Sequence, residues 1–183
     1  MIQIIESLDN AILLFINDIL SNPVLDKVMV FITSLGNLGL IWIAISLILI
    51  AIKKYRNIGF ICLGALIINL ILGEGILKNL IERPRPNGEL NGITMLIPRP
   101  ITYSFPSGHT SSAFAAALVL STYLKKYSWG FWLLAGAIAF SRLYLYVHYP
   151  SDILGGIILG LISGFISIKI SEKIKQRKRP INN

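Results

Sequence analysis

The sequence alternates long apolar segments with short polar breaks. Several of the apolar segments approach the length of about 20 residues that a helix needs to cross the hydrocarbon core of a bilayer. Hydrophobic residues make up 54% of the chain and charged residues 14%, which is more apolar than a soluble domain requires. We therefore predict an all-α, polytopic membrane bundle with five transmembrane helices, at about 28–52, 57–77, 108–124, 127–147 and 153–171.

The basic residues are concentrated in two of the breaks, at the end of the fifth span and in the C-terminal tail, 172–183. They are Lys53, Lys54, Arg56, Lys125, Lys126, Lys169, Lys173, Lys175, Arg177, Lys178 and Arg179. With five spans these regions share one side of the membrane, which the positive-inside rule makes cytoplasmic. The loop 78–107 and the turn 148–152 then face the periplasm or cell exterior. Because topology explains most of the net charge of +8, we expect a protein of the cell membrane with no nucleic-acid partner.

Residues 1–22 form an amphipathic segment. Apolar residues recur at helical spacing from Ile5 to Ile19, and polar residues share the opposite side. The continuous apolar run 11–16 is too short to span, so an interfacial helix is favoured and a sixth crossing is the alternative. Asn22 and Pro23 are typical of a helix start. We expect one domain over 1–183, without a cleaved signal peptide.

The chain has two histidines, and both lie beside groups suited to phosphate chemistry. His109 follows Pro106-Ser107-Gly108, and His148 lies six residues after Arg142 and four before Asp152. Because imidazole changes charge near neutral pH, one histidine can act as nucleophile and the other as proton donor. Asp152 can accept the Nδ1–H of His148, although an ordinary surface His–Asp contact has the same spacing.

Three cationic residues lie near the outer end of the second span or just beyond it. Lys78 can bind an anion there, or it can pair with Glu74 one turn earlier. Pro84 and Pro86 flank Arg85 and hold its guanidinium in a stiff turn. Arg83 is better explained by extension toward lipid headgroups.

Other phosphate-binding groups lie at the start of the third span and near the end of the fourth. Ser107 and Gly108 open a helix whose free N–H groups and positive end can hold phosphate oxygens, but Ser107 also suits a plain helix cap. Arg142 lies in an otherwise apolar segment. It can extend toward lipid headgroups, but a lone guanidinium there needs an anionic partner, which a substrate phosphate would supply.

Taken together, these residues resemble the three-part signature of the type 2 phosphatidic acid phosphatase family. The parts are lysine, six residues and Arg-Pro, from Lys78 to Pro86; Pro-Ser-Gly-His at 106–109; and Ser-Arg, five residues, His, three residues and Asp, from Ser141 to Asp152. The resemblance covers residues 78–152 directly.

The resemblance implies a role for each matched residue. His148 would attack the phosphoryl group to form a phosphohistidine, Asp152 would orient it, and His109 would protonate the leaving group and later activate water. The phosphate oxygens would be held by Lys78, Arg85, Arg142, Ser107 and the Gly108 amide. The family requires no metal and no cofactor.

The expected partner is a phosphorylated lipid within the bilayer, and the sequence indicates no particular oligomeric state. Related bacterial enzymes act on undecaprenyl diphosphate, phosphatidylglycerol phosphate, phosphatidic acid or lipid A phosphates. A lipid phosphotransferase using the same intermediate is one alternative, and a small transporter or scaffold is another. A vanadium-dependent haloperoxidase carries the same signature but has a soluble architecture. The polar residues gather at the outer ends of the spans, which favours the phosphatase over a transporter.

Overall fold

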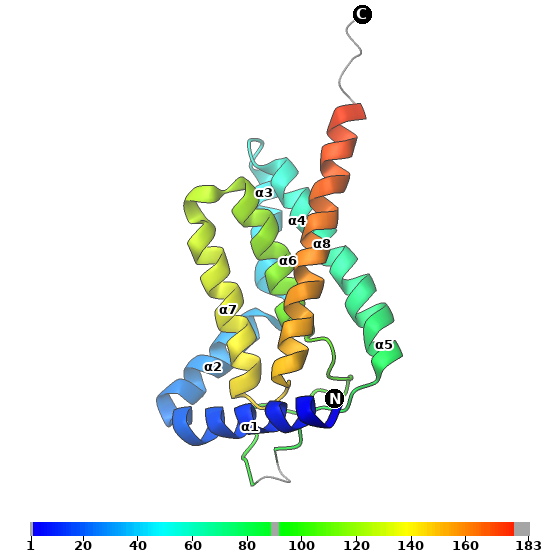
Figure 1. Cartoon of the computed structure of the whole chain (residues 1–183). Helices are drawn as coiled ribbons and strands as arrows, with labels where there is room; N and C mark the ends of the chain where they lie inside the picture. Colours follow the sequence, from blue (N-terminus) through cyan, green and yellow to red (C-terminus); the bar gives the residue numbers. More distant parts are fainter. Residues whose placement is uncertain (1, 89–91, 178–183) are drawn as a thin grey trace, which may run out of the picture.

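The structure is a computed structural model that describes residues 2–88 and 92–177. Within these ranges it contains helices and no strand, which confirms the all-α prediction. Most helices run side by side along one axis (Figure 1). The α-helices are α1 (Ile2–Leu20), α2 (Pro23–Leu35), α3 (Leu40–Ala51), α4 (Arg56–Leu70), α5 (Lys78–Ile81), α6 (Gly108–Tyr123), α7 (Ser128–Tyr144) and α8 (Pro150–Arg177). Residues 178–183 of the predicted basic tail lie outside the described part.

Two continuous helices among the described residues are long and apolar enough to cross a membrane, at Arg56–Ile81 and Pro150–Arg177. The pair α2 and α3 makes a third if it is one span, bent by 46°. The helices α6 and α7 have 16 and 17 residues, and at about 1.5 Å per residue each is shorter than a hydrocarbon core of about 30 Å. Two to three of the five predicted spans are therefore supported by length and composition.

The bend between α2 and α3 interrupts the predicted span 28–52. A short 3-10 turn, Asn37–Gly39, separates the helices, and Leu38 and Gly39 both have a left-handed backbone, with φ of 51° and 70°. Such a conformation cannot continue an α-helix, so the chain changes direction here. At the start of α2, the Asn22 side chain accepts from the amides of Val24 and Leu25, as the predicted cap requires.

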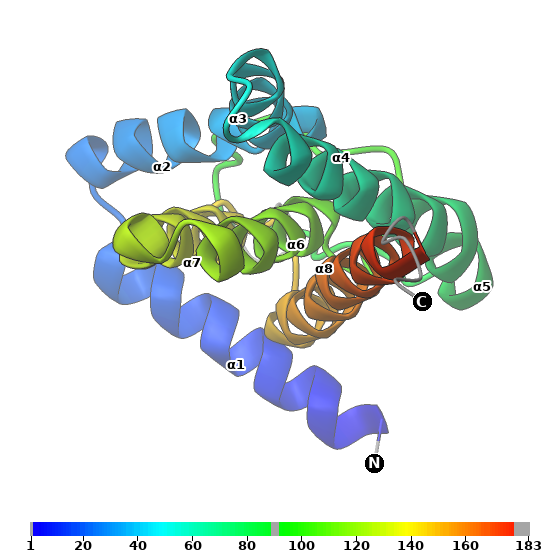
Figure 2. The ribbon, with the colours of Figure 1, turned by 90° about the horizontal axis from the view of Figure 1, so that it is seen from above.

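The amphipathic helix α1 lies across one end of the bundle (Figure 1) and passes beside α7 and α8 in the view of Figure 2. Its protein-facing side carries Asp9, Leu13 and Ile16, which are buried. Its other side exposes apolar residues that include Ile5, Ile12 and Phe15. This crosswise orientation favours the interfacial placement over a sixth crossing.

A stripe of small residues lets α8 approach α6 closely. Gly156, Gly160 and Gly164 recur every four residues on α8, and a Cβ at each would come within 3.0 Å of a backbone oxygen of α6 or its cap, Ser107, Ser111 or Ala115. Stripes of this kind bring membrane helices into backbone contact. The contact fixes the beginning of α6 beside the beginning of α8.

The helix Arg56–Ile81 contains a wider turn before its end. Residues Ile71–Leu77 form a π-helix between α4 and α5, and such turns are frequent at functional sites. Glu74 lies within this turn, and Lys78 is the first residue after it. The helix ends at Glu82, whose φ of 50° is left-handed.

Candidate active site

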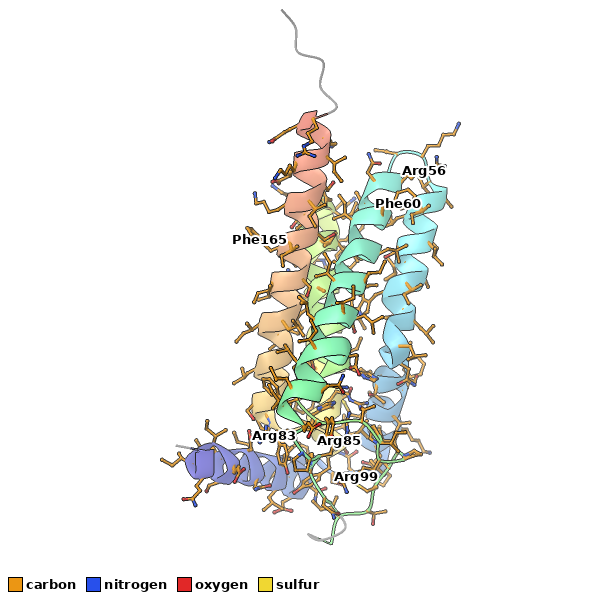
Figure 3. All side chains as sticks on the ribbon, turned by 90° about the vertical axis from the view of Figure 1, so that its right-hand side faces the viewer. Arg56, Phe60, Arg83, Arg85, Arg99 and Phe165 are labelled. Carbon is orange, nitrogen blue, oxygen red and sulfur yellow. The ribbon has the colours of Figure 1, made fainter. Side chains whose placement is uncertain are left out.

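The predicted site residues lie at one end of the bundle. The described loop residues 82–88 and 92–107, the turn between α7 and α8 and the helix α1 are all found there (Figure 1). Figure 3 shows Arg83, Arg85 and Arg99 at this end and Arg56 at the opposite end. The connections from α3 to α4 and from α6 to α7 also lie at the opposite end, with the C-terminal end of α8.

His148 lies in the turn between α7 and α8 and is 1% exposed. Its Nε2 atom is 3.0 Å from Nη1 of Arg85. Because a guanidinium has donors and no acceptor, Nε2 must accept this hydrogen bond, and the proton of the neutral ring is on Nδ1. Burial lowers the pKa of His148 to about 3, so the ring is neutral at pH 7. The hydrogen bond therefore leaves the ring lone pair on Nε2, facing Arg85.

Asp152 lies in the first turn of α8 and is fully buried. Its Oδ1 accepts from Nη1 of Arg83 at 2.7 Å, and its Oδ2 accepts from the amide of Tyr149 at 2.8 Å and from the Ser104 hydroxyl. Oδ2 also lies 3.5 Å from Nδ1 of His148. These donors hold the carboxylate in one orientation.

The predicted His148–Asp152 pair is in contact without forming a well-directed hydrogen bond. At 3.5 Å the two atoms are at the outer limit of hydrogen bonding, and Nδ1 has no hydrogen-bond partner within the described chain. Oδ2 already accepts from Ser104 and Tyr149. Catalytic hydrogen bonds are often this long before substrate binds, and they shorten in the complex.

Arg85 is 7% exposed and is held by backbone oxygens around its guanidinium. Nε donates to the carbonyl of Thr102 at 2.7 Å, Nη1 to that of Val147 at 2.8 Å, and Nη2 to that of Tyr103 at 3.1 Å. Burial lowers the pKa of Arg85, but the ordinary pKa of a guanidinium is so high that the group keeps its charge. Backbone carbonyls therefore hold this cation in place.

Lys78 is 6% exposed and makes the pair with Glu74 that was one of the two alternatives offered by the sequence. Its Nζ lies 2.6 Å from Oε1 of Glu74 and donates to the Thr102 hydroxyl at 3.4 Å. Arg85 donates to the same hydroxyl at 3.0 Å. A Cβ at Gly108 would lie 2.5 Å from Oε1 of Glu74 and 4.0 Å from Nζ of Lys78. The lysine, the Glu74 carboxylate and the beginning of α6 therefore meet.

Ser107 caps α6, and its buried hydroxyl accepts from the amide and the hydroxyl of Thr110, at 3.5 and 3.0 Å. Ser107 therefore acts as a helix cap in this structure. Two residues on, His109 donates from Nε2 to Oδ1 of Asn37 at 2.9 Å. Asn37 comes from the bend between α2 and α3, so the broken helix brings a polar partner to this histidine.

The electrostatic neighbours of His109 show that the predicted cations share one region. They are Arg142, His148, Arg85 and Lys78. Arg142 is 3% exposed and donates to the Thr33 hydroxyl. Its Nε has no hydrogen-bond partner in the described part of the chain. A buried guanidinium donor without a partner is costly, which fits the prediction that Arg142 binds an anion.

The explanation of Arg83 as a headgroup-directed residue is wrong. Its side chain is 18% exposed and pairs with Asp9 and Asp152, each at 2.7 Å. Sequence reasoning also missed Asp9, Thr33, Asn37, Thr102 and Ser104 as parts of the site. For Asp9 a signal existed, because a buried acid on an apolar helix face needs a partner.

The described loop residues also enclose two cavities beside the site. One, of about 390 Å³, is lined by residues that include Asn87, Met95 and Arg99. The other, of about 350 Å³, lies between the N-terminal segment, the loop and the end of α7. Neither is lined by a predicted catalytic residue.

Comparisons with known proteins identify relatives over most of the chain. Residues 58–176 match the PAP2 superfamily. An undecaprenyl-diphosphatase of Sulfolobus acidocaldarius is 32% identical over 136 residues, which cover 74% of this chain and 65% of that protein. Aquifex aeolicus LpxE aligns with a TM-score of 0.78 and 31% identity, over 88% of this chain and 95% of that one. A PAP2 type phosphatidylglycerolphosphate phosphatase from Bacillus subtilis gives a TM-score of 0.74 and 32% identity, over 95% and 89%.

Proposed function

The chain belongs to the PAP2 superfamily, and we propose from this premise that it removes phosphate from a membrane lipid carrying a phosphomonoester or a diphosphate. The observation that carries the proposal is the contact between Nε2 of His148 and the guanidinium of Arg85 at 3.0 Å. It joins the Nε2 lone pair of a neutral imidazole to a cation that can transfer its hydrogen bond to the group under attack. Metal-free phosphoryl transfer from a phosphate ester needs both a nucleophile and a cation that binds the phosphate.

In the first step, Nε2 of His148 attacks phosphorus, and the bond between phosphorus and the leaving oxygen breaks. Nη1 of Arg85 would move from Nε2 to a phosphate oxygen as the substrate enters. Positive charge develops on the imidazole as the N–P bond forms, and the Asp152 carboxylate beside Nδ1 stabilises it. His109 gives a proton to the departing alcohol or phosphate.

In the second step, His109 accepts a proton from a water molecule, whose oxygen attacks the phosphohistidine. The N–P bond breaks and its electron pair returns to Nε2, so inorganic phosphate leaves and His148 is regenerated. In both steps charge builds up on the equatorial oxygens. Lys78, Arg85 and Arg142, with Ser107 and the Gly108 amide, are the groups that we assign to these oxygens.

We assign the catalytic end of the bundle to the outer face of a cell membrane, with five crossings and a cytoplasmic C-terminus. The basic breaks lie at the opposite end, where Figure 3 shows Arg56, and the positive-inside rule places that end in the cytoplasm. In this arrangement α6 and α7 cross with their catalytic ends at interfacial depth. The helix α1 would lie in the outer interface with its apolar side toward lipid.

The substrate class that we propose is a prenyl diphosphate or a glycerophospholipid phosphate. Two relatives support it by name, the undecaprenyl-diphosphatase and the phosphatidylglycerolphosphate phosphatase. A cluster of cations at the end of an apolar bundle suits an anionic headgroup whose tail stays in the bilayer.

The direct test is phosphate release by the purified protein in mixed micelles. Undecaprenyl diphosphate and phosphatidylglycerol phosphate are supplied separately, with a chelator present. We expect release from at least one of them, with no release by His148→Ala and strongly reduced release by Asp152→Asn. Samples quenched in alkali, where a phosphohistidine survives, should contain a phosphorylated protein in His109→Ala and none in His148→Ala.

Several outcomes would contradict the proposal. Release that His148→Ala retains would remove the nucleophile that we assign. Appearance of the phosphate on a second lipid, with little inorganic phosphate, would identify a phosphotransferase. No turnover of either lipid by protein that melts cooperatively would favour a transporter or scaffold.

A further inference from the structure

A chain of charged side chains connects the amphipathic helix α1 to the candidate catalytic carboxylate. Asp9 of α1 accepts from Nη2 of Arg83 through Oδ2 at 2.7 Å, and Nη1 of Arg83 donates to Oδ1 of Asp152, also at 2.7 Å. The three residues come from separate parts of the sequence, 74 and 69 residues apart. One guanidinium thus binds two carboxylates with its two amino groups, a geometry that arginine offers and lysine does not.

The surroundings make this chain rigid. Ser151 donates to Asp9 from its amide at 2.9 Å and from its hydroxyl at 2.5 Å, and the same hydroxyl accepts from Arg83 at 2.6 Å. The guanidinium also stacks over the Tyr149 ring, 4.2 Å from its centroid. Asp9 is 3% exposed and Asp152 fully buried, so the pairs are shielded from water, unlike exposed ion pairs that contribute little.

This chain of charged side chains holds one of the two carboxylate oxygens of Asp152. Oδ2 faces Nδ1 of His148, while Oδ1 is bound by Arg83. Without Asp9, Arg83 would lose the ion pair that orients its guanidinium, and Asp152 would be held firmly only through Oδ2, by Ser104 and Tyr149. Supporting residues of this kind commonly change activity without touching the substrate.

We propose that Asp9 is a positioning residue of the reaction: through Arg83 it holds Asp152, and through Asp152 it orients His148. The inference rests on the proposed phosphatase function. It makes α1 part of the catalytic apparatus, because the helix supplies the carboxylate that completes the Arg83 site. Figure 3 shows Arg83 at the end of the bundle where α1 lies.

The test compares steady-state phosphate release by full-length Asp9→Asn, Asp18→Asn and wild-type protein on the same lipid phosphate. Asp18 is an exposed acid of the same helix, so Asp18→Asn is the matched control. We expect Asp9→Asn to lower kcat about tenfold with KM changed by less than about twofold, since Asp9 does not touch the phosphate. Asp18→Asn should retain wild-type kcat, and Asp9→Glu should recover part of the loss.

A double-mutant cycle tests whether Asp9 acts through Arg83. If it does, Asp9→Asn combined with Arg83→Gln should be no slower than Arg83→Gln alone, within about twofold. Losses that multiply would show that Asp9 acts independently and would overturn the proposal. So would wild-type kcat in Asp9→Asn, even with a lowered melting temperature, because the pair would then be structural only.

A milder variant covers the case in which Asp9→Asn does not fold. Ser151→Ala removes the hydroxyl that bridges Asp9 and Arg83 without removing a charge, and we expect kcat to fall roughly threefold. If Ser151→Ala keeps wild-type kcat, the proposal is overturned. Wild type and Asp18→Asn must be active and His148→Ala inactive; if wild type releases no phosphate, the proposed function fails first.

Discussion

Glu74 lies against Gly108, so that a Cβ added to the glycine would be 2.5 Å from Oε1 of the carboxylate. The same oxygen is 2.6 Å from Nζ of Lys78. The Glu74 carboxylate is therefore paired with Lys78 and lies beside Gly108, and we assign both of these residues to the binding of phosphate. An incoming phosphate must compete with it for the lysine.

We expect Glu74→Gln to bind anions more tightly. Removing the charge removes both the competitor for Lys78 and the repulsion of the phosphate. At the interaction energies of partly exposed charges, the inhibition constant for orthovanadate should fall roughly three- to tenfold. The control is Glu172→Gln, which changes an exposed acid near the opposite end of α8. Weaker inhibition of Glu74→Gln would mean that Glu74 serves to hold Lys78 in place.

Stability should fall as the pH falls below neutrality, partly because of His148. Burial lowers the pKa of this residue from 6.5 to about 3 in the folded protein. Between these values the unfolded chain binds a proton that the folded chain does not, so acid favours unfolding. The melting temperature of detergent-solubilised protein should therefore decrease from pH 7 to pH 4. His148→Gln should show a shallower decrease, and an unchanged slope would contradict the assignment.

The contact between α6 and α8 should not tolerate a methyl group. At Gly160 a Cβ would meet the backbone of Ser111 and Ala115, so Gly160→Ala should cost about 1–3 kcal/mol and lower the melting temperature. At Gly136 of α7 nothing lies within 4 Å of the added atom. Gly136→Ala should be neutral or stabilising by up to about 1 kcal/mol, because alanine favours the helix. Equal melting temperatures for the two variants would be inconsistent with this packing.

Asn37 should matter for turnover although it lies outside the signature. Its Oδ1 accepts from Nε2 of His109 at 2.9 Å, and Asn37→Ala would free the ring to rotate away from the leaving group. We expect kcat to fall roughly five- to tenfold. Ser34→Ala, which alters an exposed residue of the preceding helical turn, is the control. The prediction fails if Asn37→Ala and Ser34→Ala turn over equally fast.

The sequence was sufficient to predict that the site lies at one end of a helical bundle. Hydropathy locates the helices, and the signature residues lie at helix ends and in the connecting loops. Those ends meet once the helices pack antiparallel, which explains why Arg85 and His148, 63 residues apart, are in contact. The family resemblance supplied the roles of the two histidines, and the chain's membership of that family is confirmed.

What the sequence did not show depends on contacts that hydropathy does not report. The average over residues 28–52 stays apolar whether or not Leu38 and Gly39 adopt a left-handed backbone, so the bend that positions Asn37 was not foreseen. Arg83 was assigned to the headgroups because its two carboxylate partners, Asp9 and Asp152, are distant in the chain. The pairing of Arg83 with Asp9 is recognisable only when α1 is seen to lie across the end of α8.

The π-helical turn at Ile71–Leu77 takes up one residue more than an α-helical turn would. A helix with one residue fewer in this segment could relax to ideal α geometry while Lys78 still faced Thr102 and Gly108. If the helix kept every residue but lost the wider turn, each later side chain would rotate by about 100° around the axis, which would carry the lysine toward a different face. The wider turn therefore keeps the first part of the signature in register with the other two.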